Sequence, residues 1–268
     1  MKKFFVFSMF ILGIVVFLFL SVKPSFAPPK GGGGEGCPVN MVPLGDICLD
    51  EFEVSVWSLP PSGNGTPQGQ QFGATFDNYP CMDNGNDCSA TASNPIFAAS
   101  ALGETPSAFI TWFQAQQACL NVGKRLPTNA EWQGAAAGTP TDYEPGVDDG
   151  VDDCNTITAG AVAPTGSRSN CVSNFGAFDM VGNLGEWVAD WIQDNSDDDG
   201  GVVSTALYGM DIITGIDEAS PETDRFPSAL IRGNRFDGGS VAGVFSLDAN
   251  QAPSLSSDRF GFRCARNR

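Results

Sequence analysis

The sequence contains no histidine, and its 31 aspartate and glutamate residues outnumber its 14 lysine and arginine residues. The absence of histidine removes the most common general base, the usual serine and cysteine triads, and imidazole ligands for a metal. The net charge of −17 repels phosphate backbones, so we expect no nucleic-acid partner. Calcium, which prefers oxygen ligands, is the cation that such an acidic chain would hold.

Residues 1–27 have a basic start, an apolar run that reaches Leu20, and a small residue at Ala27. This order is typical of a secretory signal peptide. Pro28 is unfavourable directly after a cleavage site, so an uncleaved anchor that attaches the chain to a membrane is the alternative, since about 20 apolar residues span a bilayer. Both interpretations predict an extracytoplasmic protein, secreted or on the cell surface.

The rest of the chain divides into a short linker and a body that contains the cysteines. Residues 28–36 are rich in proline and glycine, which is typical of a flexible linker. Residues 37–268 have the length of one domain with long loops or of two small domains. All eight cysteines lie in this body, and an even number in an oxidising compartment favours four disulfides over thiolate metal sites or a nucleophile. Spacing alone leaves the pairing open.

Local patterns predict short strands and then two helices. Residues 37–57 alternate apolar and polar side chains around Gly45, which indicates a hairpin, and residues 58–94 have the composition of an irregular loop. Between 106 and 119 the period becomes helical, with Gly123 as the expected end and a shared face of Trp112, Ala115, Gln116, Cys119 and Leu120. A second helix is predicted from Thr128 to Ala137, because Thr128 and Glu131 have the spacing of a capping box.

Three later segments carry oxygen-bearing side chains. Residues 142–155 are either a solvated acidic loop or a calcium loop, although they lack a complete EF-hand pattern, and residues 194–227 are acidic and loop-like. In residues 175–191, Asn183, Glu186 and Asp190 offer three oxygen donors, which suits calcium. The alternative is that these polar side chains cap their own loop. The expected core anchors of this turn are Phe178, Met180, Val181, Trp187 and Trp191.

The last forty residues are framed at both ends. An apolar run leads into Arg232 and Gly233, and the chain closes with GFRC at 261–264, while the residues between follow no steady period. Exposed positions on a rigid scaffold carry recognition, so we expect function in the side chains from about Asn234 to Asp258.

Four motifs resemble, in order, the signatures of the formylglycine-generating enzyme (sulfatase-modifying factor) domain: GKRLPTNAEW at 123–132, FGAFDMVGNLGEWVADW at 175–191, LIRG at 230–233 and GFRCAR at 261–266. The resemblance implies an α+β, C-type-lectin-like fold, loop-rich, with small antiparallel sheets and two main helices, stapled by disulfides. It implies a bridge from Cys119 to Cys264, which leaves the local pairs Cys37–Cys48, Cys81–Cys88 and Cys154–Cys171.

The resemblance also implies structural calcium. The expected ligands are Asn183 and Glu186, with Asp190 and the carbonyl of Val188 nearby, and a second site near Asn155. At Gly185 the family usually has tryptophan, so we expect looser packing there.

One departure from the family concerns its chemistry. The family's oxidase holds copper with two cysteines, whose positions here fall near Ala242 and Leu247, and no cysteine lies between Cys171 and Cys264. Copper(I) requires soft ligands, so we expect no copper, no catalytic residues of that type and no formylglycine-generating activity.

The layout is most similar to the non-catalytic variable proteins of diversity-generating retroelements, in which a C-terminal segment is rewritten and displayed for binding. We name residues 231–263 the display segment. Phe236, Phe245 and Arg235 are of the types that anchor interfaces, whereas the alternative places Phe245 and Leu247 in the core. The full expected set is Asn234, Arg235, Phe236, Asp237, Ser240, Val241, Phe245, Ser246, Leu247, Asp248, Asn250 and Gln251.

The sequence thus predicts a non-enzymatic, extracellular protein that binds a protein or glycan ligand. Two alternatives are an enzyme of the family with different chemistry, using carboxylates such as Glu186 or Asp237, and a structural module of the cell envelope.

Overall fold

The structure is a computed structural model that describes residues 36–141, 149–193, 213–214 and 227–268. The expectations for the N-terminal segment and most of the linker therefore lie outside the described residues, as do most of the acidic segment 194–227 and part of the segment 142–155. Within the described part of the chain, no helix has the length and apolar character to cross a membrane.

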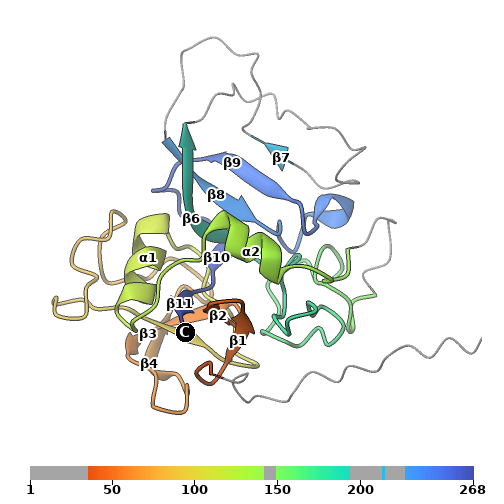
Figure 1. Cartoon of the computed structure of the whole chain (residues 1–268). Helices are drawn as coiled ribbons and strands as arrows, with labels where there is room; N and C mark the ends of the chain where they lie inside the picture. Colours follow the sequence, from red (N-terminus) through yellow and green to blue (C-terminus); the bar gives the residue numbers. More distant parts are fainter. Residues whose placement is uncertain (1–35, 142–148, 194–212, 215–226) are drawn as a thin grey trace, which may run out of the picture.

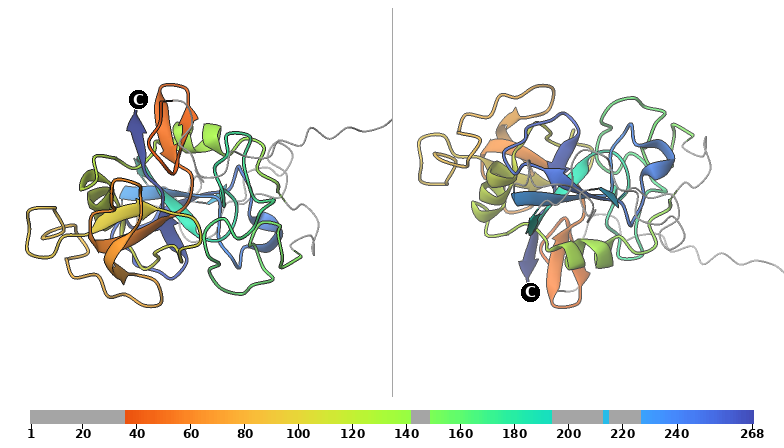
Figure 2. Two further views of the ribbon diagram at one scale, coloured as in Figure 1. Left: turned by 90° about the horizontal axis from the view of Figure 1, so that it is seen from below. Right: turned by 90° about the horizontal axis from the view of Figure 1, so that it is seen from above.

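The expected N-terminal hairpin is present. β1 (Met41–Leu44) pairs antiparallel with β2 (Ile47–Asp50), and Gly45 turns the chain with a φ of +56°. The C-terminal strand β11 (Ala265–Asn267) adds antiparallel to β2. The beginning of the body and the end of the chain therefore lie side by side, as Figures 1 and 2 show.

A second sheet has the order β4-β3-β5. Its strands are β3 (Val54–Leu59), β4 (Gln68–Phe72) and β5 (Phe97–Ser100), all antiparallel. The prediction of an irregular loop over residues 58–94 is therefore wrong at its start, because β4 pairs along β3 through a bulge.

The central sheet has five strands in the order β10-β6-β8-β9-β7. Two pairs are parallel, β10 with β6 and β7 with β9, so the sheet is mixed rather than purely antiparallel. The strands are β6 (Gly185–Gln193), β7 (Ile213–Thr214), β8 (Pro227–Arg232), β9 (Leu247–Gln251) and β10 (Phe260–Phe262). β6 occupies the second half of the segment that we expected to be a turn.

Both predicted helices form, α1 (Trp112–Leu120) and α2 (Asn129–Ala135). The Thr128–Glu131 capping box is confirmed at α2. α1 starts with a second capping box, formed by Thr111 and Gln114, which gives it a fixed beginning.

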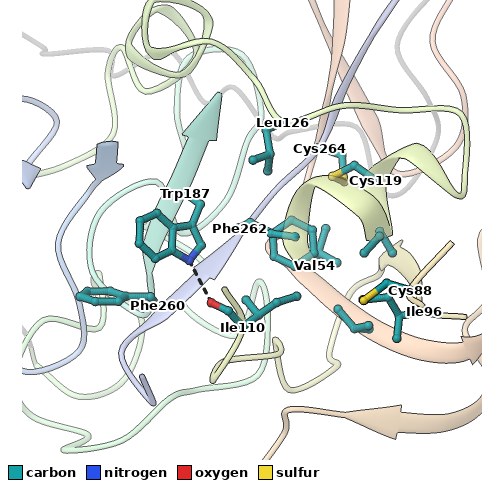
Figure 3. Close-up of a cluster of buried hydrophobic side chains, with 14 of the residues drawn as sticks. Val54, Cys88, Ile96, Ile110, Cys119, Leu126, Trp187, Phe260, Phe262 and Cys264 are labelled. Carbon is teal, nitrogen blue, oxygen red and sulfur yellow. Dashed lines mark hydrogen bonds between the residues drawn. A yellow bond between two sulfur atoms is a disulfide. The ribbon is translucent and has the colours of Figure 1, made fainter. Parts of the chain in front are cut away.

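Two apolar clusters hold the sheets and helices together. The first lies between α1, β3, β6 and β10, where Trp187 packs against Phe260 and donates its indole N–H to the Ile110 carbonyl at 3.0 Å (Figure 3). The second lies beneath α2 and includes Trp132, Met180 and Leu230. The prediction that Trp191 anchors the core is wrong, since it is 39% exposed.

All eight cysteines are in disulfides, with the predicted pairing Cys37–Cys48, Cys81–Cys88, Cys119–Cys264 and Cys154–Cys171. The Cys119–Cys264 bridge connects α1 to the residue that follows β10 by two positions, across 145 residues of chain (Figure 3). It therefore fixes the end of the display segment to the first helix.

Candidate functional site

The display segment leaves the central sheet at the end of β8. Gly233 and Asn234 have φ values of +83° and +61°, and they turn the chain away from the strand. A Cβ at Gly233 would lie 2.9 Å from the Met180 carbonyl oxygen, so this close approach requires glycine. After the short 3-10 helix η1 (Gly239–Val241), the chain returns as β9 beside β8.

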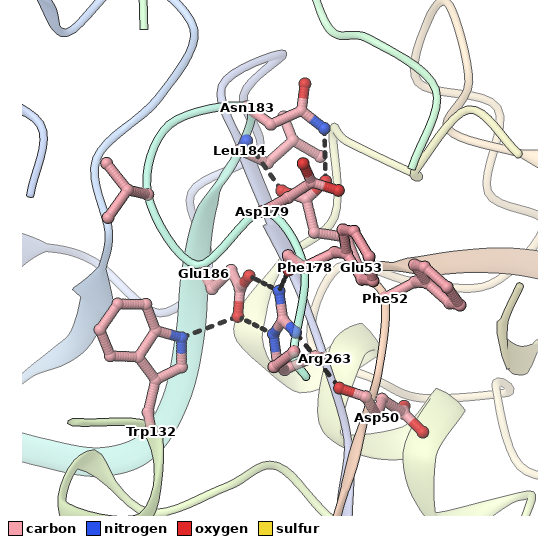
Figure 4. Close-up of polar contacts among 12 residues, drawn as sticks. Asp50, Phe52, Glu53, Trp132, Phe178, Asp179, Asn183, Leu184, Glu186 and Arg263 are labelled. Carbon is pink, nitrogen blue, oxygen red and sulfur yellow. Dashed lines mark hydrogen bonds and ion pairs between the residues drawn. The ribbon is translucent and has the colours of Figure 1, made fainter. Parts of the chain in front are cut away.

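The loop before β6 supports the start of the display segment. Gly182 N–H donates to the Gly233 carbonyl at 3.1 Å, and Phe236 N–H donates to the Asn183 carbonyl at 2.9 Å. Asn183 is buried and has a φ of +53°, a conformation that asparagine tolerates better than most residues. Its side chain accepts from Asn155 Nδ2 at 2.9 Å. It also donates to the Glu53 carboxylate, as Figure 4 shows.

Glu186 and Arg263 form a buried, two-pronged ion pair between β6 and the end of β10. Arg263 Nη2 lies 2.6 Å from Glu186 Oε1, and Arg263 Nε lies 2.7 Å from Oε2 (Figure 4). Trp132 Nε1 also donates to Oε2, at 2.8 Å, and Arg263 Nη2 donates to the Phe178 carbonyl at 2.8 Å. The carboxylate of Glu186 is thus already neutralised.

Two further acids lie near this arginine. Burial raises the pKa of Glu53 well above its usual value, and the neighbouring Asp179 and Glu186 charges raise it further. Burial also raises the pKa of Asp179 to about 6, although the Gly166 N–H and Arg263 oppose the shift. One arginine therefore faces three carboxyl groups in the interior.

The predicted calcium ligands lie in two groups, one with Glu186, Val188 and Asp190 and the other with Asn155 and Asn183. Glu186 binds Arg263, the Val188 carbonyl accepts from Trp112 Nε1 at 2.7 Å, and Asp190 Oδ2 accepts from the Asn129 N–H at 2.5 Å. All three side chains of the predicted site, Asn183, Glu186 and Asp190, thus have protein partners, and calcium at this site stays a prediction.

Asn155 and Asn183 do lie together. Asn155 Oδ1 is buried and has no hydrogen-bond partner among the described residues. The Glu53 carboxylate accepts from Asn183 Nδ2, and so does the Ala163 backbone carbonyl, at 3.2 Å. Together with the two asparagine side chains, these groups supply the hard oxygen donors that suit calcium. Glu53 was missed in the sequence because it stands 130 residues away from Asn183.

The acidic loop also brings carboxylates together. Carboxylate oxygens of Asp149, Asp152 and Asp153 lie within 4.8 Å of one another. Asp149 Oδ1 accepts from the Val151 and Asp152 N–H groups, so at least this side chain caps its own loop.

A hollow of about 270 Å³ lies over the central sheet and is lined mostly by the display segment. The buried residues Gly185, Ile231 and Phe260 are among its lining, and we name them the floor of the hollow. Its walls contain most of the side chains that we expected to be displayed, namely Asn234, Arg235, Asp237, Val241, Ser246, Asp248, Asn250 and Gln251.

The other expected residues have different positions. Phe236 is buried, and Ser240 and Phe245 are half-buried. Leu247 packs in the apolar cluster beneath α2, so the core alternative is right for this residue. The reason is the alternation of β9, which directs Leu247 and Ala249 to the core and leaves Asp248 and Asn250 for the hollow.

The walls of the hollow are held by polar contacts. Asp237 accepts from Arg235 Nε at 2.6 Å through Oδ1 and lies 2.8 Å from Arg259 Nη2 through Oδ2. On β9, Gln251 Nε2 donates to Asp248 Oδ2 at 3.1 Å and to Asn250 Oδ1 at 2.7 Å.

Gly185 is tightly packed, so the expectation of loose packing at this position is wrong. A Cβ there would lie 2.9 Å from Ile231 Cγ2 and 3.2 Å from Phe260 Cδ1. Ile231 and Phe260 occupy the space that a side chain at position 185 would need, so this position requires glycine.

The positions at which the family's oxidase has copper cysteines are buried and apolar here. Ala242 packs with Cys154, Cys171 and Val181, and Leu247 lies in the core. With every cysteine in a disulfide, the described structure offers no thiolate to copper at these positions.

Residues 68–268 match the Sulfatase-modifying factor enzyme 1-like domain, so the chain belongs to this family. Among solved structures it is similar to the Major Tropism Determinant I1 variant, with a TM-score of 0.50 and 17% identity, over 85% of this chain and 52% of that chain. This likeness supports a C-type-lectin-like fold.

The curated relatives of this chain include bacterial kinases. The chain is 28% identical over 168 residues to the serine/threonine-protein kinase pkn1 of Chlamydia pneumoniae, covering 60% of this chain and 24% of the kinase. It is 35% identical over 88 residues to the pkn1 kinase of Chlamydia caviae, covering 32% of this chain and 14% of the kinase. The chain thus spans a quarter or less of the length of these relatives.

Proposed function

We propose that this chain is a non-enzymatic ligand-binding protein, secreted or held at the cell surface, which presents the hollow beside its display segment to a protein or glycan ligand. The observation that carries the proposal is that side chains from separate parts of the display segment meet in one hollow. Side chains that share no period in the sequence line one hollow, and their backbone is fixed by β8, β9 and β10. Exposed side chains on a rigid framework are a usual location of recognition.

The framework is held at both ends of the display segment. At its start, Arg232 donates to the Val244 carbonyl at 3.0 Å and lies over the Trp132 ring, 5.0 Å from the centroid. At its end, the Cys119–Cys264 bridge fixes the chain to α1. Prior fixation of a binding surface lowers the entropy lost when a ligand binds.

The carboxylates that a different enzyme chemistry would need have structural partners. Glu186 is buried against Arg263, and Asp237 lies between Arg235 and Arg259. A carboxylate that is shared by guanidinium groups is poorly available as a base or nucleophile. This arrangement supports a binding role over catalysis.

The four disulfides favour an oxidising compartment, and this supports a location outside the cytoplasm. The layout of the display segment supports diversification by a retroelement. We expect a near-copy of the DNA for residues 231–263 that differs at adenines, next to a reverse-transcriptase gene. Its absence from the genome would contradict diversification and leave ligand binding intact.

We further propose a structural calcium ion. Asn155, Asn183 and Glu53 would hold it, and it would neutralise the buried carboxylate and fix the loop that supports Phe236. No calcium role is proposed for Glu186, Val188 or Asp190, which have the partners described above.

The binding function is tested by screening the immobilised full chain against a printed glycan array and a phage-displayed peptide library. We expect bound members in at least one panel whose binding is lost in the Asp248→Ala variant, after thermal unfolding shows that the variant is folded. The Asp87→Ala variant, at an exposed aspartate outside the hollow, is the control and should bind as the unmodified chain does. Binding that ignores Asp248, or no binding in either panel, would overturn the proposal.

A further inference from the structure

The hollow has the chemistry of a site for one uncharged sugar ring. We propose that it binds a neutral, hydroxyl-rich saccharide residue, and that it does so without a metal ion. This inference rests on the proposed binding function and specifies its ligand.

The β9 wall offers both a donor and an acceptor in fixed positions. Gln251 Nε2 donates to Asp248 Oδ2 and Asn250 Oδ1, which holds the three side chains in one arrangement. Within the described part of the chain, Asn250 Nδ2 and Gln251 Oε1 then have no hydrogen-bond partner. A sugar hydroxyl can both donate and accept, so it satisfies this pair of atoms.

The floor of the hollow suits the C–H face of a ring. Gly185 has no side chain, and Ile231 and Phe260 complete an apolar surface next to the polar wall. The volume of about 270 Å³ lies just below the usual range of ligand sites, about 300–1,000 Å³, which favours a single ring over a larger group. An apolar floor with a few placed polar groups is the usual design of a small-molecule site.

The charges around the hollow are balanced. Two arginines, Arg235 and Arg259, share the carboxylate of Asp237, and Asp248 accepts from Gln251 and from the Asn250 N–H at 3.1 Å. A phosphate or an ammonium group would therefore meet no net opposite charge. Asp237 is also a poor ligand for a metal ion, because two guanidinium groups would repel the cation.

A peptide in extended form fits this site less well. Peptides often bind by adding a strand to a sheet edge. At Leu247 and Asp248, however, β9 already has β8 on one side and β7 on the other. The wall of the hollow is therefore not an open edge at these residues.

The test uses arrays of neutral, sialylated and sulfated glycans, probed with the full chain in EDTA and in calcium. We expect binding to neutral glycans that is equal in both buffers. In the Asn250→Asp variant, the oxygen that accepts from Gln251 remains but the Nδ2 donor is lost, so we expect about tenfold weaker binding and an unchanged melting temperature. The control is Asn86→Asp, which makes the same chemical change at an exposed residue outside the hollow.

The other possible results contradict either the saccharide proposal alone or the proposed binding function as well. Binding that is confined to charged glycans, that is lost in EDTA at a temperature at which the chain stays folded, or that is indifferent to Asn250 overturns the saccharide proposal. Hollow-dependent binding in the peptide library alone also overturns it, but leaves the proposed binding function standing. Failure of both panels removes both.

Discussion

Glu186 and Arg263 bind each other through two hydrogen bonds of 2.7 and 2.6 Å, and neither side chain is more than 1% exposed. Glu186 belongs to β6, and Arg263 directly follows the neighbouring parallel strand β10, in which Gly261 pairs with Glu186. The pair therefore connects the strand beneath the hollow to the end of the display segment.

The Arg263→Met variant should lose about 3–5 kcal/mol of unfolding free energy, because it leaves a buried carboxylate without its partner. Urea unfolding measures this loss. The Arg125→Met variant is the control, because Arg125 makes a similar two-pronged contact with Glu131, at 2.7 Å for both bonds, on a partly exposed surface. Its cost should be at most about 1 kcal/mol. Equal costs for the two variants would contradict the burial argument.

The Cys119–Cys264 disulfide closes a loop of 145 residues. Its removal by a double serine substitution should therefore lower the free energy of unfolding by about 5 kcal/mol on chain-entropy grounds. The same substitution at Cys81 and Cys88, which are seven residues apart, should cost about 2 kcal/mol. Thermal unfolding of both variants tests the order. A larger loss for the short loop would show that local strain or residual structure outweighs chain entropy.

Local signals in the sequence are sufficient to predict the two helices and the first hairpin. Thr128 and Glu131 are three residues apart, and Gly45 lies between alternating segments, so each signal sits within one element. The partners of Glu186 and Asn183 gave no such signal. Arg263 is 77 residues from Glu186 and Glu53 is 130 residues from Asn183, so the sequence showed oxygen donors but not which groups would occupy them.

In the display segment, too, the sequence predicts the overall layout but not which side chains face the core. Its frame could be predicted from LIRG and GFRC, and a displayed surface between them from the absence of a period. The division of β9 into core and hollow residues required the register with β8, where Ile231 pairs with Asp248. One residue of slip would exchange the two faces.

Stability should rise in mild acid. The pKa of Asp179 is raised by burial to about 6, above its unfolded value, so the folded state binds this proton more tightly. Stability is then highest below the unfolded pKa and falls as pH rises through about 6. In EDTA, we expect a melting temperature at pH 5 that is a few degrees above that at pH 8.

The Asp179→Asn variant should flatten this pH dependence. Asparagine keeps an oxygen that can accept from the Gly166 N–H, bonded at 2.8 Å in the unmodified protein, and it tolerates the φ of +57°. Glu51, with a pKa raised by burial to about 7, gives a residual slope of the same sign. An unchanged slope in the variant would show that Asp179 does not titrate in this range.

The Gly185→Ala variant should lose about 1–3 kcal/mol, because its Cβ would lie within 2.9 Å of Ile231 and the floor must shift. Gly134 in α2 is the matched control. A Cβ there meets only Leu44, at 3.9 Å, so Gly134→Ala should stabilise the helix by up to about 1 kcal/mol. In urea unfolding, the free energy of unfolding should fall for Gly185→Ala and rise for Gly134→Ala if the close approach at Gly185 is correct.

Calcium provides the last test, because two groups of oxygen donors compete as its site. If Asn155, Asn183 and Glu53 bind the ion, added calcium should raise the melting temperature and EDTA should lower it, since a ligand that binds only the folded state stabilises it. The Asn155→Ala variant should lose this response. The Asp149→Asn variant, in the acidic loop, should keep it, because that change leaves the buried donors intact. A response that disappears with Asp149 instead would place the ion in the loop with Asp152 and Asp153.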